Sequence, residues 1–460
     1  SQLVFDRTYN YFDTGDVEQI VDGNDANNNR IFEYDDLSRL TKATGPFNSG
    51  NTAILEYHYD PTGNLRFMDW RTTPLPALGR ELVYDSSSPQ PHAVNEIREG
   101  GSSTFLTYDA NGNPLFRGNY STGFRQFNWD AENRLTSLTG LPNNGADSYF
   151  YDDSGDRVRR THSDASGTTS LIYVGGDFEW DPATNATTKY LFVGGERVAS
   201  IGSSYTPAPA EGPFAWRLQR LLPSDEVLGE MGVSAFGVLF FLLFLALMRW
   251  RLAHGRGWAI VLLKRGAVAA LCVIFFVETS VVPAQAQCLV GPAPVYRYYV
   301  SDHLGSASVI IDGDGADAGT VLEKIEYRPF GSTLSDTGGP DVRHRFTGQE
   351  RDKESGLSYY GARYYDPSIG RFLSPDSLVP DPFDSQAFNR YSYVRNNPLN
   401  RIDPSGNFDW CFGLCGSDEP PSDVPPGGGR GGGGGPPDDD PGGGDSGRTI
   451  YSSEGGEREK

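Results

Sequence analysis

The sequence predicts a mostly β fold of stacked β-hairpins, interrupted by an inserted α-helical transmembrane hairpin and followed by a disordered C-terminal tail. Three observations predict this fold. The 460 residues include 56 Gly, 31 Pro, 26 Phe and 24 Tyr, which is typical of many strands separated by turns. Aromatic–Asp pairs recur along the first part of the chain at a nearly constant spacing. One long uncharged apolar run divides the chain in two.

Each repeat begins with an aromatic residue followed by Asp, and consecutive pairs lie 21 to 25 residues apart. Such a period indicates stacked supersecondary units. The Asp side chain can bond the backbone two residues on, and a Gly or Asn one position further tolerates positive φ, so each pair predicts a tight turn. The pairs are Phe12-Asp13, Tyr34-Asp35, Tyr59-Asp60, Tyr84-Asp85, Tyr108-Asp109, Trp129-Asp130 and Tyr151-Asp152.

The residues after each turn alternate between polar and apolar, which is the period of a β-strand. A single hairpin cannot cover its own apolar face, so neighbouring repeats must stack. The alternative, an ordinary β-sandwich with chance pairs, is disfavoured by the fixed period. Ser38 stands where most repeats have Gly or Asn, and a Ser-rich stretch follows Tyr84. We expect looser turns at these two places.

Charge and motif content argue against several function classes. The net charge is −21 and the pI about 4.7, which argues against a nucleic-acid partner. The four Cys give no disulfide framework, and no phosphate loop, zinc spacing or Ser/His/Asp arrangement occurs, so no cofactor or metal is expected. The stretch from Asp312 to Glu323 lacks the Gly and the flanking helices of a calcium loop, which favours a hairpin tip. His303, beside a Gly turn, is expected to be a packed structural residue and not a base.

A Pro/Ala/Gly-rich linker at residues 205–230 leads into the apolar run. Met231 to Met248 contains no charged residue. As a helix it would be about 27 Å long, close to the ~30 Å hydrocarbon core of a bilayer. A second apolar run covers residues 260–282, mainly Gly266 to Val282, so we expect a transmembrane hairpin within 231–283. Basic residues lie between the two runs, which predicts a cytoplasmic 249–257 loop and extracytoplasmic β-rich parts on both sides.

The second apolar run has another interpretation. Lys264-Arg265, the apolar stretch after it, and Ala284-Gln285-Ala286 have the order of a secretory signal peptide, with cleavage after Ala286. The sequence leaves this alternative open beside the second membrane helix.

The region from Tyr296 to Gly406 is dense in Tyr among Gly and Pro, with VSDHLGSASVIID, YRPFG, FTGQERDKESGLSYYGARYYDP and NRYSYVRNNPLNRIDPSG. It resembles the RHS repeat-associated core, and the aromatic–Asp units resemble YD repeats. The resemblance implies hairpins coiled into a hollow β-shell, with a YD-repeat segment at 1–204 and the core at 287–406. It also implies that YLFVGGERVAS and YRYYVSDHLGS are neighbouring strands, with the membrane hairpin inserted between them. Because the chain begins in mid-pattern, we expect it to be part of a longer protein.

The resemblance further implies a self-cleavage site. In the shells of toxin complexes and polymorphic toxins, two Asp-Pro-x-Gly segments form an autoprotease that cuts just beyond the second one and frees C-terminal cargo. The second segment is present as Asp403-Pro404-Ser405-Gly406, whereas the first keeps only its acid, Asp376. Two nearby carboxylates cannot both ionise, so one would act as acid and the other as base. The alternative is that Asp376 and Asp403 only cap local turns.

Residues 407–460 are rich in Gly, Pro and Asp and have few apolar side chains, so we expect them to be disordered. The leading functional hypothesis is a membrane-tethered shell for surface interaction, adhesion or encapsulation, without classical enzyme chemistry. The alternative is an autoproteolytic toxin-delivery shell whose cargo is missing or vestigial. The expected partners are membrane lipid, together with surface proteins, glycans or an enclosed C-terminal polypeptide.

Overall fold

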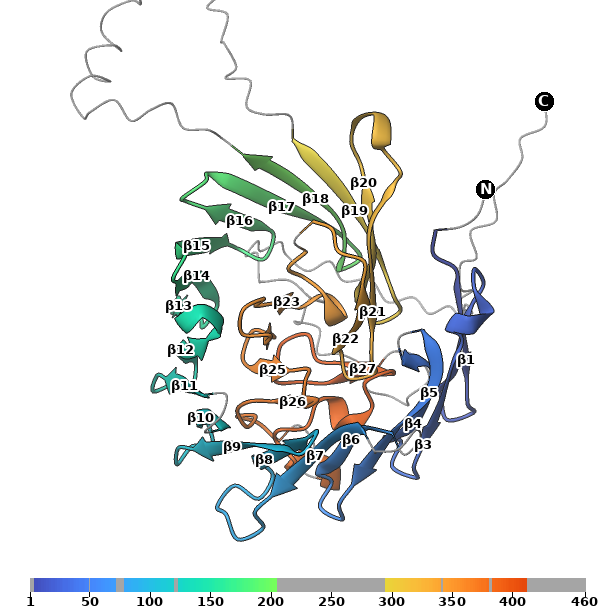
Figure 1. The fold of residues 1–460 in the computed structure, drawn as a ribbon, viewed down its shortest axis with the longest axis vertical. Helices are drawn as coiled ribbons and strands as arrows, with labels where there is room; N and C mark the ends of the chain where they lie inside the picture. Colours follow the sequence, from blue (N-terminus) through green and yellow to red (C-terminus); the bar gives the residue numbers. More distant parts are fainter. Residues whose placement is uncertain are drawn as a thin grey trace, which may run out of the picture.

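The computed structural model describes residues 4–48, 50–71, 78–119, 123–204, 294–340, 342–379 and 383–411. Within them the dominant element is a 22-stranded antiparallel sheet. Each strand pairs with the next strand in the sequence, from β1 with β2 through to β21 with β22. The sheet curves strongly, as Figure 1 shows, so the strands form a wall around the later part of the chain. The predicted mostly β, shell-like fold is confirmed.

The strands of the long sheet are β1 (Arg7–Tyr11), β2 (Val17–Asp22), β3 (Arg30–Tyr34), β4 (Leu40–Asn48), β5 (Asn51–Tyr59), β6 (Leu65–Arg71), β7 (Leu78–Tyr84), β8 (Val94–Glu99), β9 (Ser102–Tyr108), β10 (Pro114–Asn119), β11 (Gly123–Trp129), β12 (Leu135–Leu141), β13 (Gly145–Tyr151), β14 (Arg157–Asp164), β15 (Gly167–Val174), β16 (Phe178–Asp181), β17 (Ala186–Val193), β18 (Glu196–Ser204), β19 (Val295–Ser301), β20 (Ala307–Asp312), β21 (Val321–Tyr327) and β22 (Thr333–Asp336). The sheet thus continues through residues 295–336, beyond the repeats seen in the sequence.

Two small sheets follow. One contains β23 (Glu350–Arg351), β24 (Ser358–Tyr359), β25 (Tyr364–Asp366) and β26 (Arg371–Phe372), and the other contains β27 (Arg401–Ile402) and β28 (Trp410–Cys411). The helical elements of the described residues are short 3-10 turns: η1 (Ala26–Asn28), η2 (Pro142–Asn144), η3 (Gly315–Asp317), η4 (Phe346–Gly348), η5 (Ser385–Phe388) and η6 (Val394–Asn396).

The aromatic–Asp turns have the predicted geometry. At Asp60, the backbone N–H bonds the Asn64 carbonyl at 3.0 Å, and Gly63 N–H returns to the Asp60 carbonyl at 3.0 Å. The Asp60 carboxylate accepts from the amides of Thr62 and Asn64 at 2.9 and 3.0 Å. Gly63 has a φ of 81°, which is why Gly or Asn is favoured there.

The aromatic residue of each repeat also ties that repeat to the one before. Tyr59 donates from its hydroxyl to the Leu40 carbonyl at 2.7 Å, and Tyr84 donates to the Leu65 carbonyl at 2.8 Å. The acceptor is the first residue of the strand that follows the previous turn. The same contact is made by Tyr34, Tyr108, Trp129, Tyr151 and Tyr327. A polar atom on the ring explains the choice of Tyr or Trp, because a buried carbonyl needs a donor.

Two details of the predicted repeat differ. The first turn is built on Phe12, whose N–H bonds the Asp16 carbonyl, so Tyr11 takes the aromatic position and the predicted pair was out of register by one residue. The turn at Ser38 is not looser, because Ser38 adopts a φ of 55° and both backbone bonds of the turn are kept: Ser38 N–H to the Asp35 carbonyl at 2.9 Å, and Asp35 N–H to the Arg39 carbonyl at 3.0 Å. The turn after Tyr84 is longer than the others, since Tyr84 pairs with Val94.

Two further turns of this kind were missed in the sequence. Asp302 and Arg328 each begin one, with Gly305 and Gly331 in the positive-φ position. In the turn that begins at Asp302, the preceding residue Ser301 is not aromatic. In the other turn, Arg328 stands in the place of the Asp. The stretch after Asp312 forms the tip between β20 and β21, which confirms the hairpin prediction.

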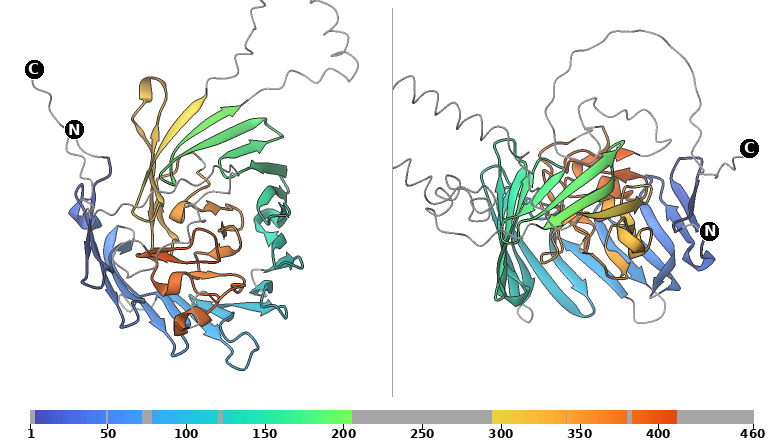
Figure 2. Two further views of the ribbon diagram at one scale, coloured as in Figure 1. Left: turned by 180° about the vertical axis from the view of Figure 1, so that it is seen from behind. Right: turned by 90° about the horizontal axis from the view of Figure 1, so that it is seen from above.

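Residues 342–411 lie inside the curve of the long sheet, as the two views of Figure 2 also show. Their contacts reach strands and turns around the wall: Val17 N–H bonds Asn400 Oδ1 at 2.8 Å, and Tyr391 Oη bonds the Gly112 carbonyl at 2.7 Å. Buried aromatic side chains fill the centre, with the Tyr365 and Tyr393 rings 4.5 Å apart. A packed core therefore fills the space behind these strands, where the sequence predicted a hollow shell.

Strands β18 and β19 are antiparallel neighbours, with Ile201 opposite Tyr296. The prediction that the segment between them is an insertion between adjacent strands is confirmed. The insertion itself lies outside the described residues, and with it Met231 to Met248, Gly266 to Val282, Ala284 and Ala286. Among the residues that the structure describes, no helix has the length and apolar character needed to cross a bilayer.

Candidate self-cleavage site

The structure brings Asp376 and Asp403 together around one guanidinium. Arg363 Nη2 lies 2.9 Å from Asp376 Oδ2 and 3.2 Å from Asp403 Oδ2. All three side chains are buried; Asp376 is 5% and Asp403 2% exposed. The two acids come from segments on either side of the small Tyr391–Tyr393 region, and Arg363 comes from the turn before β25. The pairing predicted from the sequence is thus found, with an Arg that the sequence analysis had not singled out.

Both acids also cap local turns, so the alternative interpretation holds at the same time. Asp376 Oδ1 accepts from the Leu378 amide at 2.9 Å. Asp403 Oδ1 accepts from the amides of Ser405, Gly406 and Phe408 at 3.2, 2.7 and 3.2 Å. Each carboxyl group therefore uses Oδ1 for its own turn and turns Oδ2 toward Arg363. Capping fixes the direction of the second oxygen.

The turn after Asp403 places a specific peptide bond at the Asp403 carboxyl group. Arg363 Nε donates to the Gly406 carbonyl, and Ala362 N–H bonds the Ser405 carbonyl at 3.0 Å. Gly406 has a φ of 78°, and a Cβ there would lie 2.6 Å from the Tyr360 carbonyl, so the turn requires Gly. The result is that the nitrogen of the Asn407–Phe408 bond faces the Asp403 carboxyl group.

Burial controls the protonation of both acids. Loss of solvation raises the pKa of Asp403 to about 6, although the Arg363 cation and the Phe408 and Gly406 amides act to lower it. Burial likewise raises the pKa of Asp376, against Arg363 and the Leu378 amide. Asp409 adds a further increase to the pKa of each. Repulsion between the two acids was the cause expected from the sequence; with the Arg363 guanidinium between them, the main cause of the raised pKa values is desolvation.

A cavity of about 40 Å³ opens between the acids, and it has room for at least one water molecule. Its wall includes the turn η6, in which Val394, Arg395 and Asn396 have φ values of 44°, 54° and 61°. Left-handed backbone costs an L-residue on the order of 1–2 kcal/mol, and a β-branched Val is the least suited to it. Strain of this kind is concentrated at functional sites.

The first residues of the predicted disordered tail are ordered. Trp410 and Cys411 form β28 and pair with Ile402 and Arg401, while Asp409 contacts Arg395 and Arg401. The boundary predicted at residue 406 was therefore set too early, and the rest of the tail, 412–460, lies outside the described residues. A sequence signal for Arg363 existed, because an Arg within SYYGARYY must find a carboxylate if its Tyr neighbours are buried.

Among the described residues, two groups of side chains have the composition of a metal site. They are Asp147, His162 and Glu354, and Glu179, His344 and Glu350. Guanidinium groups already occupy these carboxylates: Arg160 contacts Asp147 and Glu354, Arg343 contacts Glu179, and Arg157 contacts Glu350. These clusters act as buried ion-pair networks that join the wall to the inner residues.

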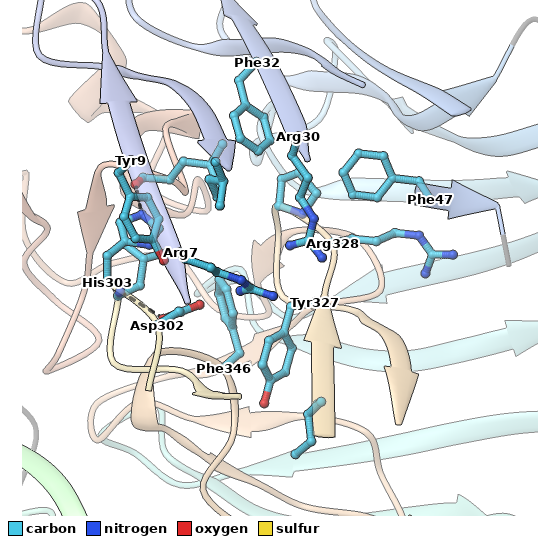
Figure 3. Close-up of a pocket in the computed structure, with 15 residues that line it drawn as sticks. Arg7, Tyr9, Arg30, Phe32, Phe47, Asp302, His303, Tyr327, Arg328 and Phe346 are labelled. Carbon is cyan, nitrogen blue, oxygen red and sulfur yellow. Dashed lines mark hydrogen bonds between the residues drawn. The ribbon is translucent and has the colours of Figure 1, made fainter. Parts of the chain in front are cut away.

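His303 is packed as predicted. Its Nε2 lies 2.8 Å from the Leu399 carbonyl, and its ring centroid is 4.3 Å from that of Tyr9. Burial lowers the pKa of His303. Figure 3 shows it at the edge of a small cavity of about 30 Å³, in which Arg7 and Arg30 come from the first strands of the wall. Both of these Arg side chains contact Glu326 on β21, which joins early and late strands of the sheet.

Comparison with known proteins agrees with this architecture. The Teneurin YD-shell family matches residues 292–399. Toxin subunit YenC1 of Yersinia entomophaga is 36% identical over 24% of the chain. The tRNA3(Ser)-specific nuclease WapA of Bacillus spizizenii is 25% identical over 82% of it. The crystal structure of TcdB2-TccC3-Cdc42 superposes on 88% of the chain with a TM-score of 0.56 and 18% identity.

The chain has the fold of a YD-repeat shell, and its residues 292–399 match that family. It spans only 12% of the length of that nuclease and 11% of that toxin subunit, and 17% of the solved shell chain. The shell fold thus follows from the comparisons, while the activity of this chain must be argued from its own residues.

Proposed function

We propose that this YD shell cuts its own chain at the Asn407–Phe408 bond by aspartic-type chemistry. One observation carries the proposal: the backbone N–H of Phe408 donates to Oδ1 of the buried Asp403 carboxyl group at 3.2 Å, which places this acid beside the nitrogen that would leave. A proton donor at the nitrogen of a peptide bond is in the position from which the leaving amine is protonated.

The two acids have different roles in this mechanism. Asp376 in its ionised form takes a proton from a water molecule in the cavity, and that water adds to the Asn407 carbonyl carbon. Asp403 in its protonated form gives its proton to the Phe408 nitrogen as the C–N bond breaks. The products are a carboxyl group on Asn407 and an amine on Phe408. Arg363 holds both Oδ2 atoms in place and keeps the two acids at a fixed separation.

The test uses the full chain made by cell-free synthesis, so that a time course begins with uncut protein. The wild type is expected to give a product whose N-terminus is Phe408, and Asp403→Asn is expected to remain intact. A matched control is Asp366→Asn, which removes another buried Asp that pairs with an Arg, here Arg117. The proposal is wrong if the wild type stays whole, or if Asp403→Asn is cut at the same bond and rate.

A second candidate function, a membrane-tethered shell for surface interaction or adhesion, is favoured by the place of the insertion. The strands β18 and β19 pair directly, so the segment that leaves at Ser204 and returns at Val295 need not disturb the wall. Loop closure entropy grows only with the logarithm of loop length. The uncharged run from Met231 to Met248 would then anchor the shell in a bilayer, with surface proteins or glycans as partners.

This tether is tested by fractionating cells that express the chain. The intact protein is expected in the membrane fraction, and a variant without residues 231–283 in the soluble fraction. Protease added outside intact cells should digest the β-rich parts and spare the 249–257 loop; the reverse pattern would overturn the orientation. A distinct fragment that begins at Gln287 would favour cleavage after Ala286 over a second membrane helix.

A further inference from the structure

The chain beyond the proposed cleavage bond is held by its own set of ion pairs. Asp409 Oδ2 lies 2.8 Å from Arg401 Nη1 and 3.2 Å from Arg395 Nε. The Asp409 side chain is 10% exposed, so these contacts are shielded from solvent. Immediately after it, β28 pairs with β27. Residues 409–411 are thus anchored to the segment around β27 and η6, independently of the turn that Asp403 caps.

Arg395 is aimed at Asp409 by the left-handed turn η6. Its Nη1 also lies 3.0 Å from Asp384 Oδ2, so the guanidinium bridges two carboxylates. A strained backbone persists only where the surroundings fix it. Here the turn directs Arg395 to Asp409, which is the second residue after the proposed cleavage bond.

The Asn407–Phe408 bond therefore spans two anchors. On one side Asp403 holds the Gly406 turn, and on the other side the Asp409 contacts hold the outgoing strand. Fixing both flanks of a peptide bond against an acid is the condition for a near-attack geometry.

We propose that Asp409 is a positioning residue for self-cleavage: clamped by Arg395 and Arg401, it holds the Phe408 nitrogen against the Asp403 carboxyl group. This inference rests on the proposed self-cleavage. It adds a residue on the departing side of the bond, two positions after it.

Asp409 has an electrostatic effect that provides an independent readout. Its negative charge raises the pKa of both Asp403 and Asp376. The charged groups that line the cavity are Arg363, Asp376, Arg390, Arg395, Asp403 and Asp409. Removing the Asp409 charge must therefore lower the pKa of Asp403. Cleavage slows at high pH as Asp403 loses its proton. The pH at which the rate has fallen to half, the alkaline midpoint, would therefore move to lower pH.

The experiment compares cleavage time courses of the full chain across pH 4–9 for the wild type, Asp409→Asn, Asp409→Glu and Arg395→Gln. Asp409→Asn is expected to slow cleavage about 10- to 100-fold and to move the alkaline midpoint to lower pH. Asp409→Glu keeps the charge and should restore the midpoint and part of the rate. Arg395→Gln should slow cleavage in the same direction as Asp409→Asn, and Asp366→Asn should leave rate and midpoint unchanged.

The outcomes separate the two proposals. If the wild type cuts and Asp409→Asn cuts at the wild-type rate with the wild-type midpoint, the role of Asp409 is overturned and self-cleavage stands. If Asp409→Asn is slow but its midpoint is unmoved and Asp409→Glu gives no rescue, Asp409 is only structural and the inference again fails. If the wild type does not cut, both are overturned.

Discussion

The Oδ1 atom of Asp403 lies 3.2 Å from the backbone nitrogen of Phe408, on the far side of the turn that the same carboxyl group caps. One side chain thus shapes the loop and meets the bond that the loop presents. Because Asp403 is beside this bond, its protonation state controls whether it can act on the bond as an acid.

The first prediction concerns the pH dependence of self-cleavage. The rate should rise from low pH as Asp376, whose pKa is raised by burial, loses its proton and becomes a base. It should fall again as pH rises through about 6, where Asp403 loses the proton it must donate. Initial rates from a gel or mass-spectrometric time course measure this profile. A rate that increases steadily from pH 5 to 9 would contradict the assigned roles.

The second prediction concerns the hydroxyl groups that tie the repeats together. Tyr108→Phe removes the 2.7 Å bond to the Val94 carbonyl and keeps the ring. The carbonyl loses its donor, which costs on the order of 1 kcal/mol. The melting temperature should fall by about 1–4 °C. Tyr298→Phe, at a side chain 49% exposed, is the control and should change little. Equal effects of the two substitutions would show that the hydroxyl contact is not what matters.

The third prediction concerns the insertion between β18 and β19. Replacing residues 205–293 by a short Asn-Gly turn should leave the wall intact, since Ile201 and Tyr296 are already paired. A shorter loop loses less entropy on closure, so stability should increase by about 2–3 kcal/mol. Far-ultraviolet circular dichroism and the melting temperature measure both effects. A variant that fails to fold would mean that the insertion takes part in the fold.

The fourth prediction concerns the fate of the cut piece. After cleavage, the Asp409 ion pairs and the β27–β28 pairing still hold residues 409–411. The C-terminal piece should therefore co-elute with the shell in size-exclusion chromatography at low salt. Because these ion pairs are shielded from solvent, high salt should weaken retention only slightly, whereas Arg401→Gln should weaken it clearly. Complete separation of the two pieces at low salt would show that these contacts are too weak to retain the product.

The repeat was predictable from the sequence because its turn depends on a few backbone requirements. Gly63 and Asn133 take positive φ as expected, and Asp60 caps as expected. What failed was the prediction of a looser turn at Ser38, where most repeats have Gly or Asn. Ser38 adopts positive φ because the surrounding hydrogen bonds, including one from its hydroxyl to Asp16 at 2.9 Å, compensate the strain.

The site was predictable only in part. Asp376 and Asp403 could be found from the Asp-Pro-Ser-Gly segment, but their common partner Arg363 lies in a different segment, and only the fold brings them together. Asp409 was hidden in a tail whose Gly, Pro and Asp content is typical of disorder. Its order depends on contacts with Arg395 and Arg401, which lie outside the tail, so the composition of the tail does not reveal them.

The wall is a meander in which every strand bonds only its neighbours in the sequence, and each turn is bonded to the repeat before it. Duplication or loss of one hairpin in the gene would therefore lengthen or shorten the wall without rethreading the remaining strands. A protein built this way can change the size of its wall through unequal recombination, while the segment packed inside the wall stays the same.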